Sequence, residues 1–234
     1  MIRLDKFLAQ MNIGTRSEVK TAVKKGKVTV NGEVCKNADV KIDETVDIIC
    51  FENREIAYEK YVYYMLNKPA GVVSATKDNL DKTVLDLLAG ENTKELFPVG
   101  RLDKDTEGLL LLTNDGELAH NLLSPKKHIS KTYRVSTKEV ILENQLEALR
   151  QGVDIGEDAM TLPAKAEKIG ENELLLTIYE GKFHQVKRML KAVGNEVVYL
   201  ERKKMGQLSL DDTLARGEYR RLSPDEVALL KNEK

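Results

Sequence analysis

The sequence holds few of the residues that build metal centres and disulfide frameworks. It has two cysteines, Cys35 and Cys50, and three histidines in 234 residues. The cysteines show no paired spacing, which fits a reducing compartment and predicts neither a zinc site nor a disulfide framework. The histidines, His120, His128 and His184, are scattered along the chain. We therefore expect no bound metal.

Long apolar segments are missing as well. The amino terminus begins with charged residues inside an amphipathic pattern, and no apolar run approaches the length of a membrane span or a signal sequence. This absence predicts a cytoplasmic protein without a membrane partner.

The net charge of −1 conceals an uneven distribution of basic residues. Together with a pI near 6.4, this charge would normally argue against a nucleic-acid-binding protein. However, residues 1–30 carry seven Lys and Arg against two acidic residues, whereas residues 31–60 carry four against eight. Residues 182–204 again carry seven basic residues against two acidic ones. Basic surface is therefore concentrated in two segments of the chain.

The first part of the chain has the pattern of a small module of two helices and a hairpin. Residues 2–10 place their apolar side chains on one helical face, and Ser17 can cap a second helix that stops at Gly26. Residues 27–30 alternate like a strand and lead into Asn31-Gly32, which is a strong tight-turn signal.

A polar stretch at residues 52–60 lacks apolar periodicity, and we interpret it as a linker between two domains, residues 1–57 and 58–234. In the second domain, strand-like segments outnumber helical ones and no βαβ alternation appears. This pattern predicts an α+β fold with an antiparallel or mixed sheet and helices packed against it. We expect strands at 61–66, 108–113, 131–137, 162–168, 173–179 and 196–202, and helices at 116–123, 143–151, 183–193 and 224–231.

The most informative segment is the charged turn of residues 100–108, Gly-Arg-Leu-Asp-Lys-Asp-Thr-Glu-Gly, which lies between two strand-like apolar stretches. Flanking strands would hold the turn rigid while its side chains reach a cleft, which is how a reactive Asp103 would be mounted. Asp and Gly also form ordinary hairpin loops, so the residue types alone leave both interpretations open.

Three blocks in order carry a resemblance to a known family. They are Gly100-Arg101-Leu102-Asp103, Lys131-Thr132-Tyr133, and residues 180–189, Glu-Gly-Lys-Phe-His-Gln-Val-Lys-Arg-Met. The chain resembles the RsuA-type bacterial pseudouridine synthases, which isomerise a uridine in folded ribosomal RNA. The resemblance implies that Asp103 is the nucleophile, that no cofactor is required, and that the second domain has a central mixed, mainly antiparallel sheet with flanking helices.

The family resemblance also nominates partners for Asp103. Lys187 matches a basic residue that pairs with the catalytic Asp, although phosphate contact or a solvated helix face would also suit it. Tyr133 matches the tyrosine on which the flipped base stacks, and a core tyrosine is the alternative. Arg101 is expected to hold a phosphate or to pair with Asp105.

In the segment 183–193 we expect one apolar face and one polar face. The apolar face would carry Phe183, Val186, Met189, Leu190 and Val193, and the polar face His184, Lys187, Arg188 and Lys191. We assign RNA contact to Arg188 and no catalytic role to His184. The turn Lys68-Pro69-Ala70-Gly71 resembles a further family motif, and we expect it to shape the floor of the active site without chemistry.

Residues 1–60 resemble the S4 RNA-binding domain through three short blocks: residues 3–8, 15–18 and 26–32. In that family the second helix and the following turn face phosphate. The resemblance nominates an S4 cluster of Arg16, Lys20, Lys24, Lys25 and Lys27 for RNA contact. Basic residues that merely coat an exposed helix are the alternative.

The predicted function is site-specific pseudouridine formation in ribosomal RNA, free or within a ribosome assembly intermediate, by a monomeric enzyme. The segment 183–189 is more similar to the branch that acts on uridine 516 of small-subunit 16S rRNA than to its large-subunit relatives. A synthase acting on 23S rRNA, a noncatalytic RNA-binding protein, and a glycosylase that releases the base are the alternatives.

Overall fold

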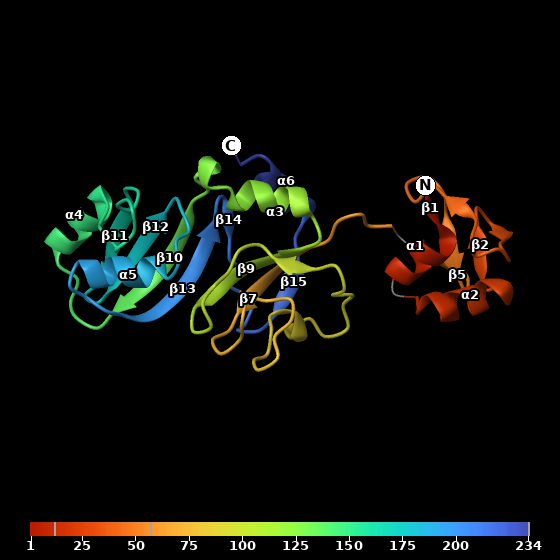
Figure 1. Cartoon of the computed structure of the whole chain (residues 1–234), viewed down its shortest axis with the longest axis horizontal. Helices are drawn as coiled ribbons and strands as arrows, with labels where there is room; N and C mark the ends of the chain where they lie inside the picture. The colour runs from red at the N-terminus through yellow and green to blue at the C-terminus, as the bar shows by residue number, and fades with distance from the viewer. Residues whose placement is uncertain (12, 57, 234) are drawn as a thin grey trace. The chain divides into compact units, whose positions relative to one another are not determined.

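The computed structural model describes residues 1–11, 13–56 and 58–233, and the chain forms two compact units, Met1–Lys60 and Tyr61–Lys234 (Figure 1). The domain boundary predicted after residue 57 falls at Ala57, which lies outside the described residues. Within the described residues, the first unit has one apolar core and the second unit has two.

The first unit packs two helices, α1 (Leu4–Gln10) and α2 (Arg16–Lys24), against short strands. Its core joins apolar residues of both helices, among them Phe7 and Val23, to Val28 and Ile49 of the strands. Within the described residues, β3-β2-β5-β6 form one sheet and β1 pairs with β4. These strands are β1 (Ile2–Arg3), β2 (Val28–Val30), β3 (Glu33–Val34), β4 (Lys41–Ile42), β5 (Ile49–Phe51) and β6 (Arg54–Glu55).

The N-terminal cap of α2 differs from the sequence prediction. Thr15, not Ser17, is the cap: its hydroxyl accepts the Glu18 amide N–H at 3.3 Å, and the Glu18 carboxylate accepts the Thr15 amide N–H at 2.8 Å. The prediction was wrong because a threonine followed three residues later by glutamate satisfies two free amides at once.

The predicted linker at residues 52–60 is also partly wrong. Arg54–Glu55 pairs with β5 in an antiparallel hairpin, and Glu52 and Asn53 form its turn with positive φ angles. Polar residues dominate this hairpin because both residues of β6 are exposed, which removes the apolar alternation on which the prediction depended.

The second unit is built on one mixed sheet of nine strands within the described residues, in the order β11-β12-β10-β13-β9-β7-β15, with β14 on β13 and β8 on β9. Among the described residues, neighbouring strands of this sheet pair antiparallel, apart from the parallel pairing of β13 with β9. The predicted α+β fold with a mainly antiparallel mixed sheet is confirmed. The strands are β7 (Tyr63–Lys68), β8 (Phe97–Pro98), β9 (Glu107–Thr113), β10 (Lys131–Thr137), β11 (Lys165–Gly170), β12 (Glu173–Ile178), β13 (Val197–Met205), β14 (Leu208–Ser209) and β15 (Tyr219–Arg221).

Helices cover both faces of this sheet (Figure 1). α4 (Glu143–Gln151) and α5 (Gln185–Ala192) pack into one core, and α3 (Gly116–Leu123) and α6 (Pro224–Lys231) pack into the other. Short 3₁₀ turns lie at Leu85–Leu87 and Pro125–Lys127. The middle of β9 is a run of four leucines because Leu110 and Leu112 enter the first core while Leu109 and Leu111 enter the second.

Candidate active site

Asp103 lies in the segment that connects β8 to β9, at the point where the sheet changes from antiparallel to parallel pairing. Gly108, the second residue of β9, lies opposite Arg202 of β13 with a φ of +96°. A Cβ atom at this position would lie 2.4 Å from the Arg202 carbonyl oxygen. Because any larger residue would push β9 away from β13, glycine at this position fixes the base of the catalytic segment.

Lys68, at the end of β7, holds the backbone of this segment from below. Its side chain is fully buried, and its Nζ donates to the carbonyl oxygens of Asp103 (3.1 Å), Lys104 (3.3 Å) and Thr106 (2.8 Å), and of Pro69 (3.0 Å). The sequence predicted only that the turn starting at Lys68 shapes the floor of the active site. It did not predict that the Lys68 ammonium group holds the backbone around Asp103. The signal in the sequence was a lysine at the end of a strand of mostly apolar and aromatic residues, because a lysine ammonium buried at such a place requires several acceptors.

Two further contacts fix the same segment to the loop after β7. The Ser74 hydroxyl donates to the Leu102 carbonyl oxygen at 2.9 Å and accepts the Leu102 amide at 3.1 Å. Lys104 pairs with Asp81 at 2.6 Å. The side chains of Lys68, Ser74 and Asp81 therefore all contact the segment around Asp103, which preorganises the carboxylate.

Two side chains of the α5 region face the Asp103 carboxylate. Lys187 Nζ lies 3.3 Å from Oδ2 of Asp103, and His184 Nε2 lies 3.5 Å from Oδ1. The structure thus brings together Asp103 and Lys187, which the sequence analysis nominated as a pair. It also brings in His184, to which the sequence analysis gave no catalytic role.

Lys187 is shared between two carboxylates. Its Nζ donates to both oxygens of Asp105, at 2.6 and 2.8 Å, which are shorter than its distance to Asp103. Burial lowers the pKa of Lys187, but the hydrogen bond to Asp105 and the charge of Asp103 outweigh burial and raise it above its ordinary value. The ammonium group therefore remains charged beside Asp103, and Asp105 pairs with Lys187 rather than with Arg101.

The start of α5 differs from the predicted apolar face. Phe183 is 74% exposed, and His184 adopts a left-handed conformation (φ 48°) immediately before the helix begins at Gln185. The Phe183 ring stacks on the His184 ring with a centroid distance of 3.8 Å. Periodicity failed here because the helix begins two residues later than predicted, so Phe183 lies outside its 3.6-residue repeat.

A pocket of about 650 Å³ opens beside Asp103. Asp103, Lys187, His184, Arg101 and Tyr133 of β10 are among the residues that line it. Tyr133 is 8% exposed and belongs to the first core of the unit, so its ring is both a pocket wall and a core residue. The volume is sufficient for a nucleotide-sized ligand.

Two other nominated residues differ in their surroundings. Arg101 is exposed at the pocket. Arg188 is engaged by the protein: its guanidinium donates to the carbonyl oxygens of Ile155 and Phe183 and pairs with Glu157 at 2.6 Å. RNA contact by Arg188 stays a prediction, and its present contacts serve to anchor the start of α5.

The S4 cluster forms an exposed set on the first unit. Arg16, Lys20, Lys24, Lys25 and Lys27 are all solvent-exposed. Lys27 pairs with the equally exposed Glu52 at 2.6 Å, and Lys20 lies 3.8 Å from Asp5. The Lys27–Glu52 pair is exposed on both sides and therefore contributes little to stability, whereas the Asp5 carboxylate is buried.

The described part of the chain holds no group of three or more His, Cys, Asp or Glu side chains placed to bind a metal ion. Among the same residues, no helix has the length and apolar character needed to cross a membrane.

Models of two known families match the sequence. The model of the RNA pseudouridylate synthases matches residues 62–192, which include Asp103, Tyr133 and Lys187, and the model of the S4 domain matches residues 2–48.

Similar proteins extend over almost the whole chain. The uncharacterized RNA pseudouridine synthase YtzG of Bacillus subtilis is 51% identical, over 98% of this chain and 98% of its own. The ribosomal small subunit pseudouridine synthase A of Vibrio cholerae is 46% identical, over 97% of this chain and 98% of its own. A pseudouridylate synthase of known crystal structure is 41% identical, with a TM-score of 0.71 over 98% of this chain and 100% of its own. The chain therefore belongs to the RNA pseudouridylate synthase family, among its RsuA-type members with an amino-terminal S4 domain.

Proposed function

We propose that this RNA pseudouridine synthase isomerises a uridine of small-subunit ribosomal RNA, with uridine 516 of 16S rRNA as its target. The observation that carries the chemistry is the pocket where Asp103, Lys187 and Tyr133 meet. The small-subunit assignment is supported by 46% identity with the Vibrio cholerae protein named ribosomal small subunit pseudouridine synthase A.

The reaction requires a carboxylate beneath the ribose. Breaking the N1–C1′ bond leaves the electron pair on uracil and positive character at C1′, which Asp103 stabilises or captures covalently. The uracil then turns, C5 bonds to C1′, C5 loses its proton and N1 gains one. Atoms and electrons balance without an oxidant, a reductant or a water molecule.

The surroundings of Asp103 fit this role better than base release. A glycosylase needs a second carboxylate that is free to activate water, and Asp105 instead gives both oxygens to Lys187. The hydrogen bond from Lys187 lowers the pKa of Asp105, which keeps it ionised and unsuited to general-base work near neutral pH.

Mapping pseudouridines in the ribosomal RNA of cells with and without the gene tests the proposal. We expect one pseudouridine, at position 516 of 16S rRNA, to disappear and to return with the wild-type gene but not with an Asp103→Asn gene. Loss of a pseudouridine in 23S rRNA instead would assign the enzyme to the large subunit.

Assays with the purified protein test which form of the RNA is the substrate. They compare turnover of naked 16S rRNA with turnover of 16S rRNA that carries ribosomal proteins, and faster turnover of the second would identify an assembly intermediate as the partner. We further propose that the enzyme acts as a monomer in the cytoplasm, which light scattering and cell fractionation test.

The S4 cluster is expected to act through phosphate charge. Replacing Lys24, Lys25 and Lys27 with alanine should weaken RNA binding and make it less dependent on salt. Each phosphate that a lysine neutralises adds about −0.9 in a duplex, or about −0.7 in a single strand, to the slope of log K against log salt concentration, so loss of all three lysines removes up to about three such contributions. Binding is measured as a function of salt concentration. The exposed Lys94 of the second unit provides a control, and an unchanged slope in the triple variant would show that the cluster is only a solvated surface.

Tyr133 is expected to serve as a stacking platform. Tyr133→Phe should keep most of the turnover because it retains the aromatic face, whereas Tyr133→Ala should lose turnover because the extruded base loses a contact worth about 1–3 kcal/mol. Because Tyr133 is 8% exposed in the core, the alanine variant is also expected to lose about 3–5 kcal/mol of stability.

Single-turnover rates and melting temperatures of both Tyr133 variants separate the two effects. Activity of Tyr133→Ala that returns fully at low temperature, where the variant is folded, would mean that the ring is structural only.

A further inference from the structure

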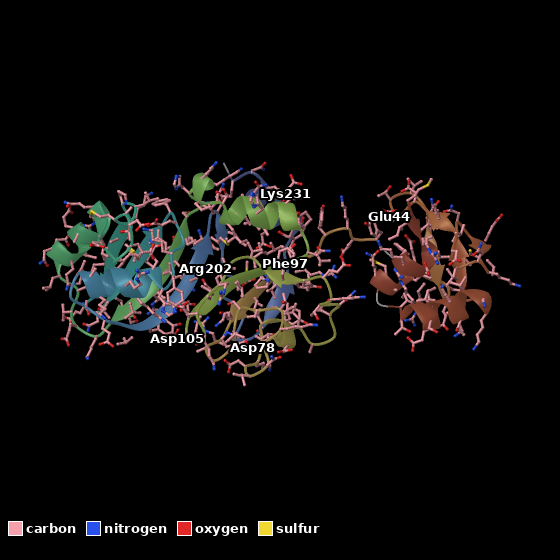
Figure 2. The ribbon with its side chains drawn as sticks, viewed as in Figure 1. Glu44, Asp78, Phe97, Asp105, Arg202 and Lys231 are labelled. Atoms are coloured by element: carbon pink, nitrogen blue, oxygen red, sulfur yellow. The ribbon has the colours of Figure 1, made fainter. Side chains whose placement is uncertain are left out.

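Two cations line the active-site pocket without a carboxylate partner among the residues that the structure describes. Arg202 of β13 and Lys131 of β10 both line the pocket that contains Asp103 and Tyr133. Arg202 is only 2% exposed and lies inside the second unit (Figure 2). Neither residue was predicted from the sequence to have a role of its own.

The guanidinium of Arg202 has unused hydrogen-bonding capacity. Its Nε donates to the Leu109 carbonyl oxygen at 2.8 Å, while its buried Nη2 has no hydrogen-bond partner among the described residues. The neighbouring Glu201 is taken by Arg216 at 2.9 Å and approached by Lys203 at 3.5 Å. A buried guanidinium without a carboxylate is costly to the folded protein, which indicates that a ligand completes it.

Lys131 adds a second positive charge to the same wall. Its Nζ donates to the Ile129 carbonyl oxygen at 3.1 Å, which leaves donors to spare. Burial and the positive charge of Arg202 lower the pKa of Lys131 to about 8. Two cations that repel each other inside one pocket would both be stabilised by a negatively charged group between them.

The register of the sheet places these cations beside the stacking tyrosine. Tyr133 of β10 is the direct partner of Arg202 on β13, and directly opposed side chains lie on the same face with Cβ atoms about 5 Å apart. Lys131 is two residues before Tyr133 on β10, across a register shift in the pairing with β13, and it lines the same pocket as Tyr133 and Arg202. A base that stacks on Tyr133 would have both cations at its edge.

We propose that Arg202 and Lys131 stabilise the uracil anion that leaves when the N1–C1′ bond breaks. The electron pair of that bond moves onto the uracil ring and is delocalised over N1 and the carbonyl oxygens O2 and O4. Donors preorganised around such oxygens are most effective in a pocket that excludes water. This inference rests on the proposed function and assigns a leaving-group role to these two residues.

The test compares uridine with 5-fluorouridine at the target position of an RNA substrate. Fluorine withdraws electrons from the ring, so the fluorinated base leaves more easily and depends less on outside stabilisation. Single-turnover loss of the original nucleoside is measured for the wild-type enzyme, Lys131→Gln and Arg202→Gln. Lys204→Gln, an exposed lysine on the same strand as Arg202, is the matched control.

We expect Lys131→Gln and Arg202→Gln to slow the reaction of uridine by about 10²-fold and that of 5-fluorouridine by clearly less, with Lys204→Gln near wild type.

Equal rate losses on uridine and 5-fluorouridine would overturn the proposal. If these equal losses disappeared at high RNA concentration, the two residues would instead bind phosphate. Lys131→Gln decides the outcome if Arg202→Gln fails to fold, because Lys131 lacks the cross-strand bond to Leu109. A wild-type enzyme that converts no ribosomal uridine would contradict the proposed function itself.

Discussion

Replacing Asp103 with asparagine is expected to abolish pseudouridine formation while RNA affinity stays within severalfold of wild type. Asparagine preserves the size of the side chain but removes the charge and the nucleophilic oxygen, and loss of a covalent nucleophile typically costs on the order of 10⁴-fold or more in rate. The backbone contacts of Lys68 and Ser74 with this segment do not involve the Asp103 side chain, so the loop should keep its conformation. Tritium release from RNA labelled at C5 of uridine measures the reaction.

Asp105→Asn is the matched control for this substitution. The Asp105 side chain is 72% exposed, and its carboxylate competes with Asp103 for Lys187. Removing that competitor leaves Lys187 beside Asp103, so we expect activity to be retained. Normal turnover by Asp103→Asn, or a complete loss in Asp105→Asn alone, would contradict the assignment of the nucleophile.

The residues that meet at Asp103 could be nominated from the sequence because each lies in a short block of distinctive residues. Asp103, Lys187 and Tyr133 come from three such blocks, and the structure places all three on one pocket. The strand β9 could also be predicted from its run of leucines, since a strand covered by helices on both faces lacks the alternation of apolar and polar residues.

The other contributors to the site could not be read from the sequence because their environment is set by distant segments. Arg202 lies in a run of four charged residues, 201–204, that reads as a solvated strand, and its contact with Leu109 spans 93 positions. His184 lies 3.5 Å from Asp103, which is 81 positions away in the chain, and its left-handed backbone (φ 48°) ends the helical periodicity on which the prediction for residues 183–193 depended.

Lys68→Met is expected to reduce kcat/KM by about 10²-fold or more, although Lys68 touches no reacting atom. Its Nζ is the donor to the backbone oxygens of Asp103, Lys104 and Thr106, and methionine fills the space without replacing these bonds. A shift of about 1 Å in the Asp103 carboxylate is enough for a loss of this size. The exposed Lys77 of the adjoining loop offers the control, and Lys77→Met should leave kcat/KM unchanged.

The same variant should change the pH dependence of stability. Burial lowers the pKa of Lys68 to about 8, although the charges of Asp105, Glu107 and Asp103 oppose the shift. In the unfolded chain the pKa returns to about 10.4, so between these two values the unfolded state binds more protons than the native state. The free energy of unfolding therefore rises with pH across this window and levels off below pH 8, where Lys68 is charged in both states.

Urea unfolding at pH 7 and pH 9.5 measures this term. Lys68 should add about 2 kcal/mol to the stability of the wild-type protein between the two pH values, and Lys68→Met should lack that increment. At pH 7 the lost hydrogen bonds are partly offset by removal of a buried charge, so we expect the variant to remain folded there. An identical rise in both proteins together with wild-type kcat/KM in the variant would show that Lys68 neither titrates in this range nor positions Asp103.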